Sequence, residues 1–433
     1  MTNVSYVRTE MVPQKAPPTA VAGPIMWMRE NLFSNIPNAA MTLLSVYFLY
    51  TLLAGILPWI FHSSVMADSL GGCRDAIKAA YGEDASGACW AVIRERWHQL
   101  LFGFYPNELY WRPTLTFVLM IVAIAPVLFD ALPRRMMWIT ALFPFAAFWL
   151  LWGGSIWLPV TVLLGFVIGG VALSMLPALI GTLGATLAAV LLPIVWWGLL
   201  TGTVESGLQS LIPMEFAPVE SAKFGGFMLS VTIGITGISL SLPIGILLAL
   251  GRQSNLFVVR TICIGFIEFI RGVPLITLLF VASTLLNYFL PPGTTFDLIL
   301  RVMIMVTIFA SAYMAEVIRG GLAALPKGQY EAADALGLDY WKSMRLIIMP
   351  QALKIAIPSI VSNFIGLFKD TTLVSIIGLL DPIGLSGSIR ADQNWNGIVW
   401  ELYGFIALMF WIFCFSMSRY SMYLERKLQT GHR

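Results

Sequence analysis

Long apolar runs separated by short polar stretches dominate the hydrophobic pattern of the first half of the chain. Two runs cover residues 39–61 and 113–132, and the uncharged stretch 136–204 divides into three more. Glycine, serine and proline mark the two divisions, at residues 153–155 and 176–177. Because an apolar helix of about 20 residues crosses the hydrocarbon core of a bilayer, each run predicts a membrane-spanning helix.

A second block of apolar runs follows the polar segment 205–223. These runs cover residues 227–250, 257–290, 302–318, 355–380 and 402–423. The second run is unusually long and contains Pro274, which predicts a break or kink in the helix. The pattern therefore predicts an all-α integral membrane protein of about ten transmembrane helices, five in each half.

Composition supports a membrane protein and excludes several other classes. The chain is 58% hydrophobic and 11% charged, too apolar for one water-soluble core. A net charge of +3, without a basic stripe carrying interleaved aromatics, argues against nucleic acid as a partner. The sequence has no phosphate-binding Gly-x-x-x-x-Gly-Lys-Ser/Thr loop and no His-Glu-x-x-His pair. We therefore expect no cofactor and no metal bound by this chain, and no enzymatic activity of its own.

The distribution of lysine and arginine predicts the orientation. These residues are most frequent in segments that ten spans would place on the same side as the N-terminus, so both termini are predicted to be cytoplasmic. The expected organisation is a cytoplasmic tail 1–38, a membrane extension 39–201 with an external loop 62–112, an external connector 202–226, a membrane core 227–423 and a cytoplasmic tail 424–433.

The four cysteines fall into two groups. Cys263 and Cys414 lie in apolar runs and are expected to be small buried side chains. Cys73 and Cys89 share the polar loop 62–112, so they form a disulfide if that loop lies outside the cell and they come close enough. Their spacing alone leaves both the bonded and the free states open.

A polar segment within the second half carries the most specific motif. Gln329-Tyr330-Glu331-Ala332-Ala333 leads through three residues to Gly337, and Met349-Pro350 follows after a further eleven. Residues 330–336 are expected to form a short helix that Gly337 ends in a left-handed conformation, with Asp339 capping the next helix. The motif resembles the EAA loop of ABC-importer permeases, with Met349 where leucine is usual. The alternative is an ordinary amphipathic loop helix.

Further segments resemble the polar amino-acid branch of that family. They are residues 268–275, with Val273 where threonine is usual, and residues 312–321, 351–352 and 369–373. The resemblance covers the chain from about Phe224 onwards. The long membrane extension before it resembles the larger permease subunits of general L-amino-acid and glutamate/glutamine/aspartate/asparagine importers.

This resemblance implies a fold, a location and a set of partners. The last five helices would form a type I ABC-importer permease core in the bacterial inner membrane. The loop 319–354 would dock on a separate ATPase dimer that binds ATP and Mg, and the coupling residues would be Gln329, Glu331, Ala332, Ala333, Gly337 and Pro350. A periplasmic amino-acid-binding protein, membrane lipid and a second permease, either related or identical, would complete the assembly.

Ionisable residues at membrane depth are the candidates for the substrate pathway. Glu268 and Arg271 are three residues apart, which fits an ion pair and substrate contact equally well. Asp370 and Asn363, seven residues earlier, share a helix face, whereas Lys369 points elsewhere. Asp370 and Arg271 would complement the ammonium and carboxylate of an amino acid.

The neutral amide of Asn363 argues against strict specificity for arginine-like substrates. We therefore expect import of acidic, amide or a broad range of L-amino acids by alternating access. The alternative is an ion-coupled secondary carrier, which would explain the charges within the membrane but not the EAA loop.

Overall fold

A computed structural model describes residues 23–129, 131–285, 288 and 296–429. Within these residues the chain is almost entirely helical and separates into two compact units, the first ending at Ala91 and the second beginning at Val92. The predicted tail residues 1–22 and 430–433, and the end of the predicted span 257–290, lie outside the described residues.

The first unit contains one long apolar helix and a small polar lobe. Its helices are α1 (Pro24–Asn31), α2 (Ile36–Phe61) and α3 (Leu70–Tyr81). Asn35 caps α2 by accepting a hydrogen bond from the Asn38 backbone N–H, and no residue of α2 is buried. In the lobe Cys73 and Cys89 form a disulfide, with their Cα atoms 5.9 Å apart.

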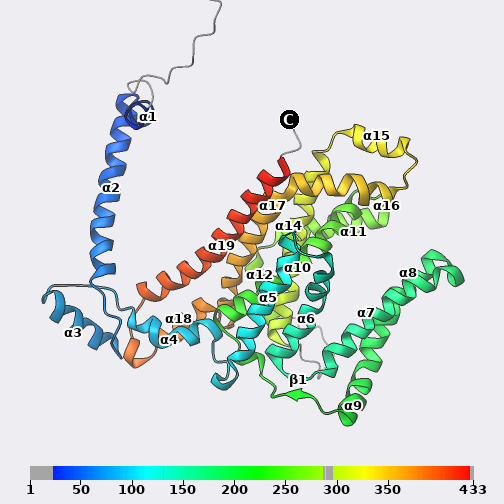
Figure 1. The fold of residues 1–433 in the computed structure, drawn as a ribbon, viewed down its shortest axis with the longest axis horizontal. Coiled ribbons are helices and arrows are strands. Elements are labelled where there is room, and N and C mark those ends of the chain that lie inside the picture. The colour runs from blue at the N-terminus through cyan, green and yellow to red at the C-terminus, as the bar shows by residue number, and fades with distance from the viewer. Residues whose placement is uncertain (1–22, 130, 286–287, 289–295, 430–433) are drawn as a thin grey trace, which may run out of the picture. The chain divides into compact units, whose positions relative to one another are not determined.

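The second unit begins with the remaining helices of the membrane extension (Figure 1). Its elements are α4 (Ala91–Phe102), η1 (Asn107–Leu109), α5 (Trp111–Leu128), η2 (Arg134–Met136), α6 (Met137–Trp152), β1 (Gly154–Ser155), α7 (Trp157–Met175), α8 (Pro177–Val195), η3 (Trp196–Leu200), α9 (Thr201–Leu211), β2 (Glu215–Phe216) and η4 (Ser221–Lys223). The segment after Pro177 is interrupted at Gly181 (φ +73°) and then continues through α8, η3 and α9 to Leu211, past the predicted boundary at residue 202.

The core follows in the same unit. Its elements are α10 (Gly226–Arg252), α11 (Phe257–Gly272), α12 (Leu275–Phe280), η5 (Val281–Leu285), α14 (Leu298–Ala323), α15 (Lys327–Ala335), α16 (Tyr340–Ser343), η6 (Met344–Ile348), α17 (Met349–Asp370), η7 (Thr371–Ile377), α18 (Pro382–Arg390), η8 (Gln393–Trp395) and α19 (Trp400–Gln429). Glycines bring the central helices close together. A Cβ on Gly245 would lie 2.7 Å from the Met314 side chain, and one on Gly237 would lie 3.1 Å from Leu367 and from Val306.

The number of candidate spans agrees with the prediction. Among the described residues nine helices are long and apolar enough to cross a membrane, or ten if the bent pair formed by α11 and α12 with η5 is one span. That pair bends by 100° next to Pro274, as the proline predicts.

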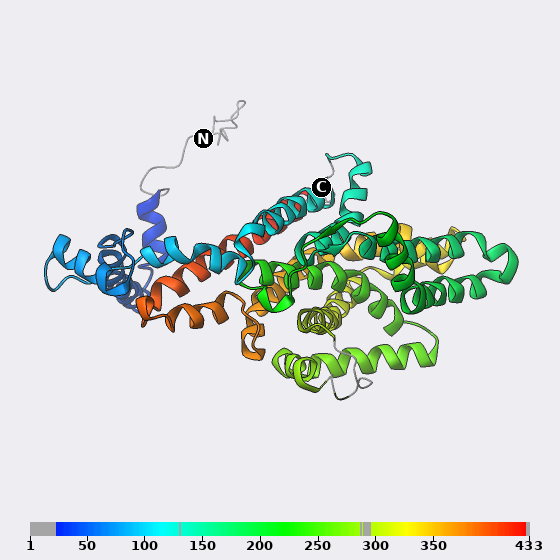
Figure 2. The same ribbon diagram turned by 90° about the horizontal axis from the view of Figure 1, so that it is seen from below.

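Segments expected on one side of the membrane meet at one end of the second unit. β1 and β2 pair antiparallel, and backbone bridges join Gly103 to Phe224 and Gly225 to Leu380. Arg96 donates a hydrogen bond of 2.8 Å to Asp392. At the opposite end the Tyr420 hydroxyl donates to the Leu128 carbonyl, and α5 runs alongside α19 (Figure 2). The extension from Val92 onwards therefore packs with the core as one unit.

Candidate functional site

Two short helices and the turn between them form an elbow at residues 327–343. Gly337 adopts φ +69° at the end of α15, and Asp339 caps α16 by accepting a hydrogen bond of 2.9 Å from the Lys342 backbone N–H. This backbone hydrogen bond and the Lys342 ammonium, 3.0 Å away, lower the pKa of Asp339 below its usual value. The turn predicted from the sequence is confirmed.

One predicted coupling residue of the elbow, Ala333, is not exposed on its surface. Glu331 and Ala332 are exposed, but Ala333 is fully buried within the chain, so it is not available to a partner's surface. Neighbouring residues on a helix point about 100° apart, which is why the two alanines cannot share one role. Leu336 is 73% exposed and Trp341 is 67% exposed, an apolar pair that the sequence motif did not single out.

The elbow is connected to two long helices of the core, α14 and α17. It follows α14 after three residues, and Figure 1 shows α15 projecting beyond the end of the α14 and α17 helices. The Gln351 amide donates a hydrogen bond of 3.0 Å to the Gln329 side-chain oxygen, which links α15 to the first turn of α17. Pro350 lies in that turn, directly after the π-helical segment η6. The elbow is therefore joined directly to both α14 and α17.

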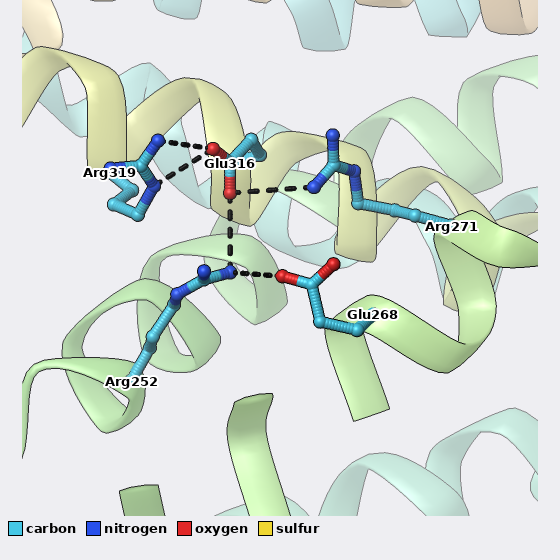
Figure 3. A network of polar contacts seen from close by, with 5 residues as sticks. All are labelled: Arg252, Glu268, Arg271, Glu316 and Arg319. Carbon is cyan, nitrogen blue, oxygen red and sulfur yellow. Dashed lines mark hydrogen bonds and ion pairs between the residues drawn. The ribbon is translucent and has the colours of Figure 1, made fainter. Parts of the chain in front are cut away.

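A charge network joins α10, α11 and α14 (Figure 3). Glu316 is its centre: its carboxylate accepts from Arg319 Nε at 2.8 Å and from Arg252 Nη1 at 3.3 Å, and lies 3.6 Å from Arg271 Nη1. Arg252 also donates to Glu268 at 3.0 Å. Glu268 and Arg271 are thus joined through partners on other helices, and no direct ion pair between these two described residues is formed.

A central cavity of about 290 Å³ lies between α10, α14 and α17. Asn363 and Asp370 both line it, as their shared helix face predicts, and Lys369 does not. The polar groups that join them are Ser241, Tyr313 and Ser362, with Phe309 and Met314 among the apolar ones. Ser241 and Tyr313 lie near the middle of α10 and α14, so the cavity lies about halfway along these helices.

Arg271 and Glu268 do not line this cavity. The Arg271 guanidinium lies 5.6 Å from the centre of the Tyr313 ring, so Tyr313 connects the cavity to the charge network. A helix rises about 1.5 Å per residue, which places Glu316 only about 4.5 Å along α14 from Tyr313. Arg252, Tyr313 and Glu316 were not predicted as site residues, because nothing in the local sequence indicates which distant charges they meet.

Comparison with known proteins decides the family. A family model for the inner membrane component of binding-protein-dependent transport systems matches residues 241–430. The glutamate/glutamine/aspartate/asparagine transport system permease protein BztC of Rhodobacter capsulatus is 57% identical over 100% of both chains. The chain belongs to the amino-acid permeases of ABC importers. The inner membrane amino-acid ABC transporter permease YhdY of Escherichia coli is 39% identical over 94% of each chain.

Shorter members of the family match about half of this permease. The L-cystine transport system permease protein TcyB of Bacillus subtilis is 30% identical over 50% of this chain and 90% of its own. A solved amino acid ABC transporter with histidines aligns with 28% identity and a TM-score of 0.42, over 46% of this chain and 91% of that one. This permease is therefore a non-catalytic, multi-pass membrane subunit that works with a separate ATPase and a substrate-binding protein.

Proposed function

We propose that this permease carries glutamate, glutamine, aspartate and asparagine inward through the central cavity, and that Asp370 and Asn363 bind the substrate. The BztC relative bears those four substrates in its name and aligns over the whole chain. The observation that carries the proposal is that Asp370, Asn363 and Tyr313 all line one cavity between the core helices.

Each polar group has a role that its chemistry fits. The Asp370 carboxylate accepts hydrogen bonds from the substrate ammonium, a charge-assisted pairing that is strong away from bulk water. Asn363 offers a side-chain amide that both donates and accepts, so it accommodates a carboxamide or a carboxylate side chain. None of the described residues that line the cavity is cationic, and the second permease of the assembly supplies the remaining contacts to the substrate carboxylate.

The mechanism is alternating access driven from the elbow. The elbow docks on an ATPase subunit through its exposed side, which includes Glu331, Ala332 and Leu336. Closure of two ATPase subunits around ATP and Mg moves the elbow, and with it α14 and the first turn of α17. The charge network sits between this input and the cavity, so its ion pairs rearrange as the cavity changes the side to which it opens.

The orientation and partners follow from this arrangement. The elbow and both termini face the cytoplasm, and the connections at the β1 and β2 end face the periplasm, where a binding protein delivers the substrate. The disulfide between Cys73 and Cys89 supports a periplasmic location for their loop, because disulfides persist in oxidising compartments. The core 227–423 moves the substrate, the extension 39–201 supports it, and a second related permease completes the pair.

Uptake by the purified importer in proteoliposomes tests this proposal. Asp370→Asn should lower glutamine uptake at least tenfold, because the ammonium loses its charged partner. Lys369→Gln, on the adjacent residue that does not line the cavity, is the matched control and should retain uptake. In the Asn363→Asp variant, added arginine should inhibit glutamine uptake more strongly, relative to added glutamate, than it does in the wild type. Unchanged rate and selectivity in the Asp370 and Asn363 variants would remove the cavity from the pathway.

A further inference from the structure

A second, larger space lies between the membrane extension and the core. This apolar groove has a volume of about 1050 Å³ and is walled by α5, α6, α10, α14 and α19, with the end of α4 at its mouth. All of its walls belong to the second unit, and no described residue lines both the groove and the central cavity. The substrate pathway does not use the groove.

The chemistry of the walls excludes water as its occupant. Most of the lining is bulky and apolar, including Phe117, Met120, Phe143, Met303 and Phe413. Five lining hydroxyls already donate to carbonyls of the chain, those of Thr114, Thr116, Thr140, Thr232 and Thr236. A buried water needs two to four polar partners, and cavities lined by apolar groups stay dry. The lining of the groove therefore favours an apolar ligand.

The tryptophan, tyrosine, histidine and aspartate side chains of the lining gather at one end of the groove. Trp97, His98 and Tyr110 lie there, with the His98 ring 4.2 Å from Trp97 and 5.3 Å from Tyr110. Asp297, whose carboxylate caps α14, lies at the same end. Tryptophan and tyrosine prefer the boundary between the hydrocarbon and the headgroups. This distribution of side chains along the groove fits an amphipathic molecule whose polar part lies beside Trp97, His98 and Tyr110.

The length of the groove also fits one leaflet. Along α10 its lining runs from Phe227 to Leu240, which is about 20 Å at 1.5 Å per residue. Half of a bilayer's hydrocarbon core is about 15 Å thick. Phe117, Leu240 and Leu300 in the lining are each at least 40% exposed, so the groove opens onto the surface of the helical bundle.

We propose that this groove binds a phospholipid of the leaflet on the α4 side, with its acyl chains between the extension and the core and its headgroup beside Trp97 and His98. Packing of another transmembrane helix prefers small residues at the contact, whereas this lining is rich in phenylalanine and methionine. The bound lipid fills the space between the two halves and holds α5 and α6 against the core.

Photolabelling of the complete importer tests this assignment. The importer is placed in nanodiscs that contain phosphatidylethanolamine with a diazirine on one acyl chain, illuminated, and digested for peptide mapping. Labelling should concentrate on the lining segments of α5 and α10. Ala147→Phe fills the groove and should lower that labelling at least fivefold. Ala141→Phe, on the same helix but outside the lining, should leave it unchanged.

Two results would overturn the proposal. One is labelling spread evenly over all membrane-facing helices, with no effect of Ala147→Phe; this outcome means that only bulk lipid touches the protein. The other is a disulfide between Leu49→Cys on α2 and Phe117→Cys at the groove, which would make α2 the occupant. Both leave the proposed transport function intact, because the groove and the cavity share no described residue.

Discussion

Arg271 lies 3.6 Å from Glu316, on a different helix, although its position next to Glu268 first indicates a partner on its own helix. Glu316 is the only carboxylate among the described residues that Arg252, Arg271 and Arg319 share. Its side chain is 25% exposed, so the three guanidinium groups meet where water only partly screens them. Glu316 therefore supplies the negative charge that all three guanidinium groups share, and within the described part of the chain Glu268 pairs with Arg252 alone.

Removal of that charge should disable the importer. Glu316→Gln leaves Arg252, Arg271 and Arg319 close together without their common counter-ion, which breaks a partly buried network. We expect uptake in proteoliposomes to fall at least tenfold and the unfolding midpoint of the purified complex to drop. Glu268→Gln is the control, because its carboxylate is 53% exposed and has one partner in the network, and it should have a much smaller effect. Equal effects of the two variants would contradict a central role for Glu316.

The exposed apolar side of the elbow should be needed to hold the ATPase. Leu336→Asp places a charge at a side chain that is 73% exposed in this chain, and an unpaired charge buried in an interface with the ATPase weakens binding. We expect at least tenfold less ATPase to co-purify with the permease, while the permease still inserts into the membrane. Leu256→Asp, at a residue 67% exposed outside the elbow, should retain the ATPase. If the Leu336→Asp permease retains the ATPase fully, the docking site does not include Leu336.

The close approach of Gly103 to Gly225 should be intolerant of any side chain. Gly103 has φ +70°, and a Cβ there would lie 2.5 Å from the Gly225 Cα, an overlap that the backbone must move to relieve. Gly103→Ala should destabilise the complex by about 2 kcal/mol or more, measured as a lower unfolding midpoint. Gly387→Ala, on α18 with nothing within 4 Å of the added carbon, should be neutral or slightly stabilising. An unchanged unfolding midpoint in Gly103→Ala would show that the extension and the core are not in close contact at Gly103 and Gly225.

Asp381 should give the permease a characteristic pH dependence. It is fully buried and caps α18 through the Gly384 backbone N–H at 2.9 Å, and burial raises its pKa from 3.8 to about 6. Because the folded state binds this proton more tightly than the unfolded state, the stability that it contributes is highest below about pH 4 and falls as the pH rises to 6.

Comparison with an amide isolates this contribution. Asp381→Asn keeps a capping oxygen but carries no charge. The unfolding midpoint of the variant should therefore rise relative to that of the wild type as the pH rises from 4 to 6. The measurement is the difference in unfolding midpoint between the two proteins at pH 4 to 8. A difference that does not change across this range would contradict the raised pKa.

The sequence predicted local features well and distant pairings poorly. Apolar runs located the spans, Pro274 located the 100° bend, and Gly337 with Asp339 located the elbow, because each depends on neighbouring residues. The partnership of Arg252 with Glu316 depends on how α10 packs against α14, which a single sequence does not reveal. The burial of Ala333 likewise follows from the rotation of α15 against the core.

The importer's energy source provides the most direct test of its mechanism. The complete complex is reconstituted with its binding protein on one side of the vesicle, and glutamine uptake and ATP hydrolysis are measured together. Uptake should require ATP on the side that the elbow faces, and Leu336→Asp should abolish it. Uptake driven by a sodium or proton gradient without ATP hydrolysis, or by ATP on the opposite side only, would contradict transport through an ATPase-coupled elbow.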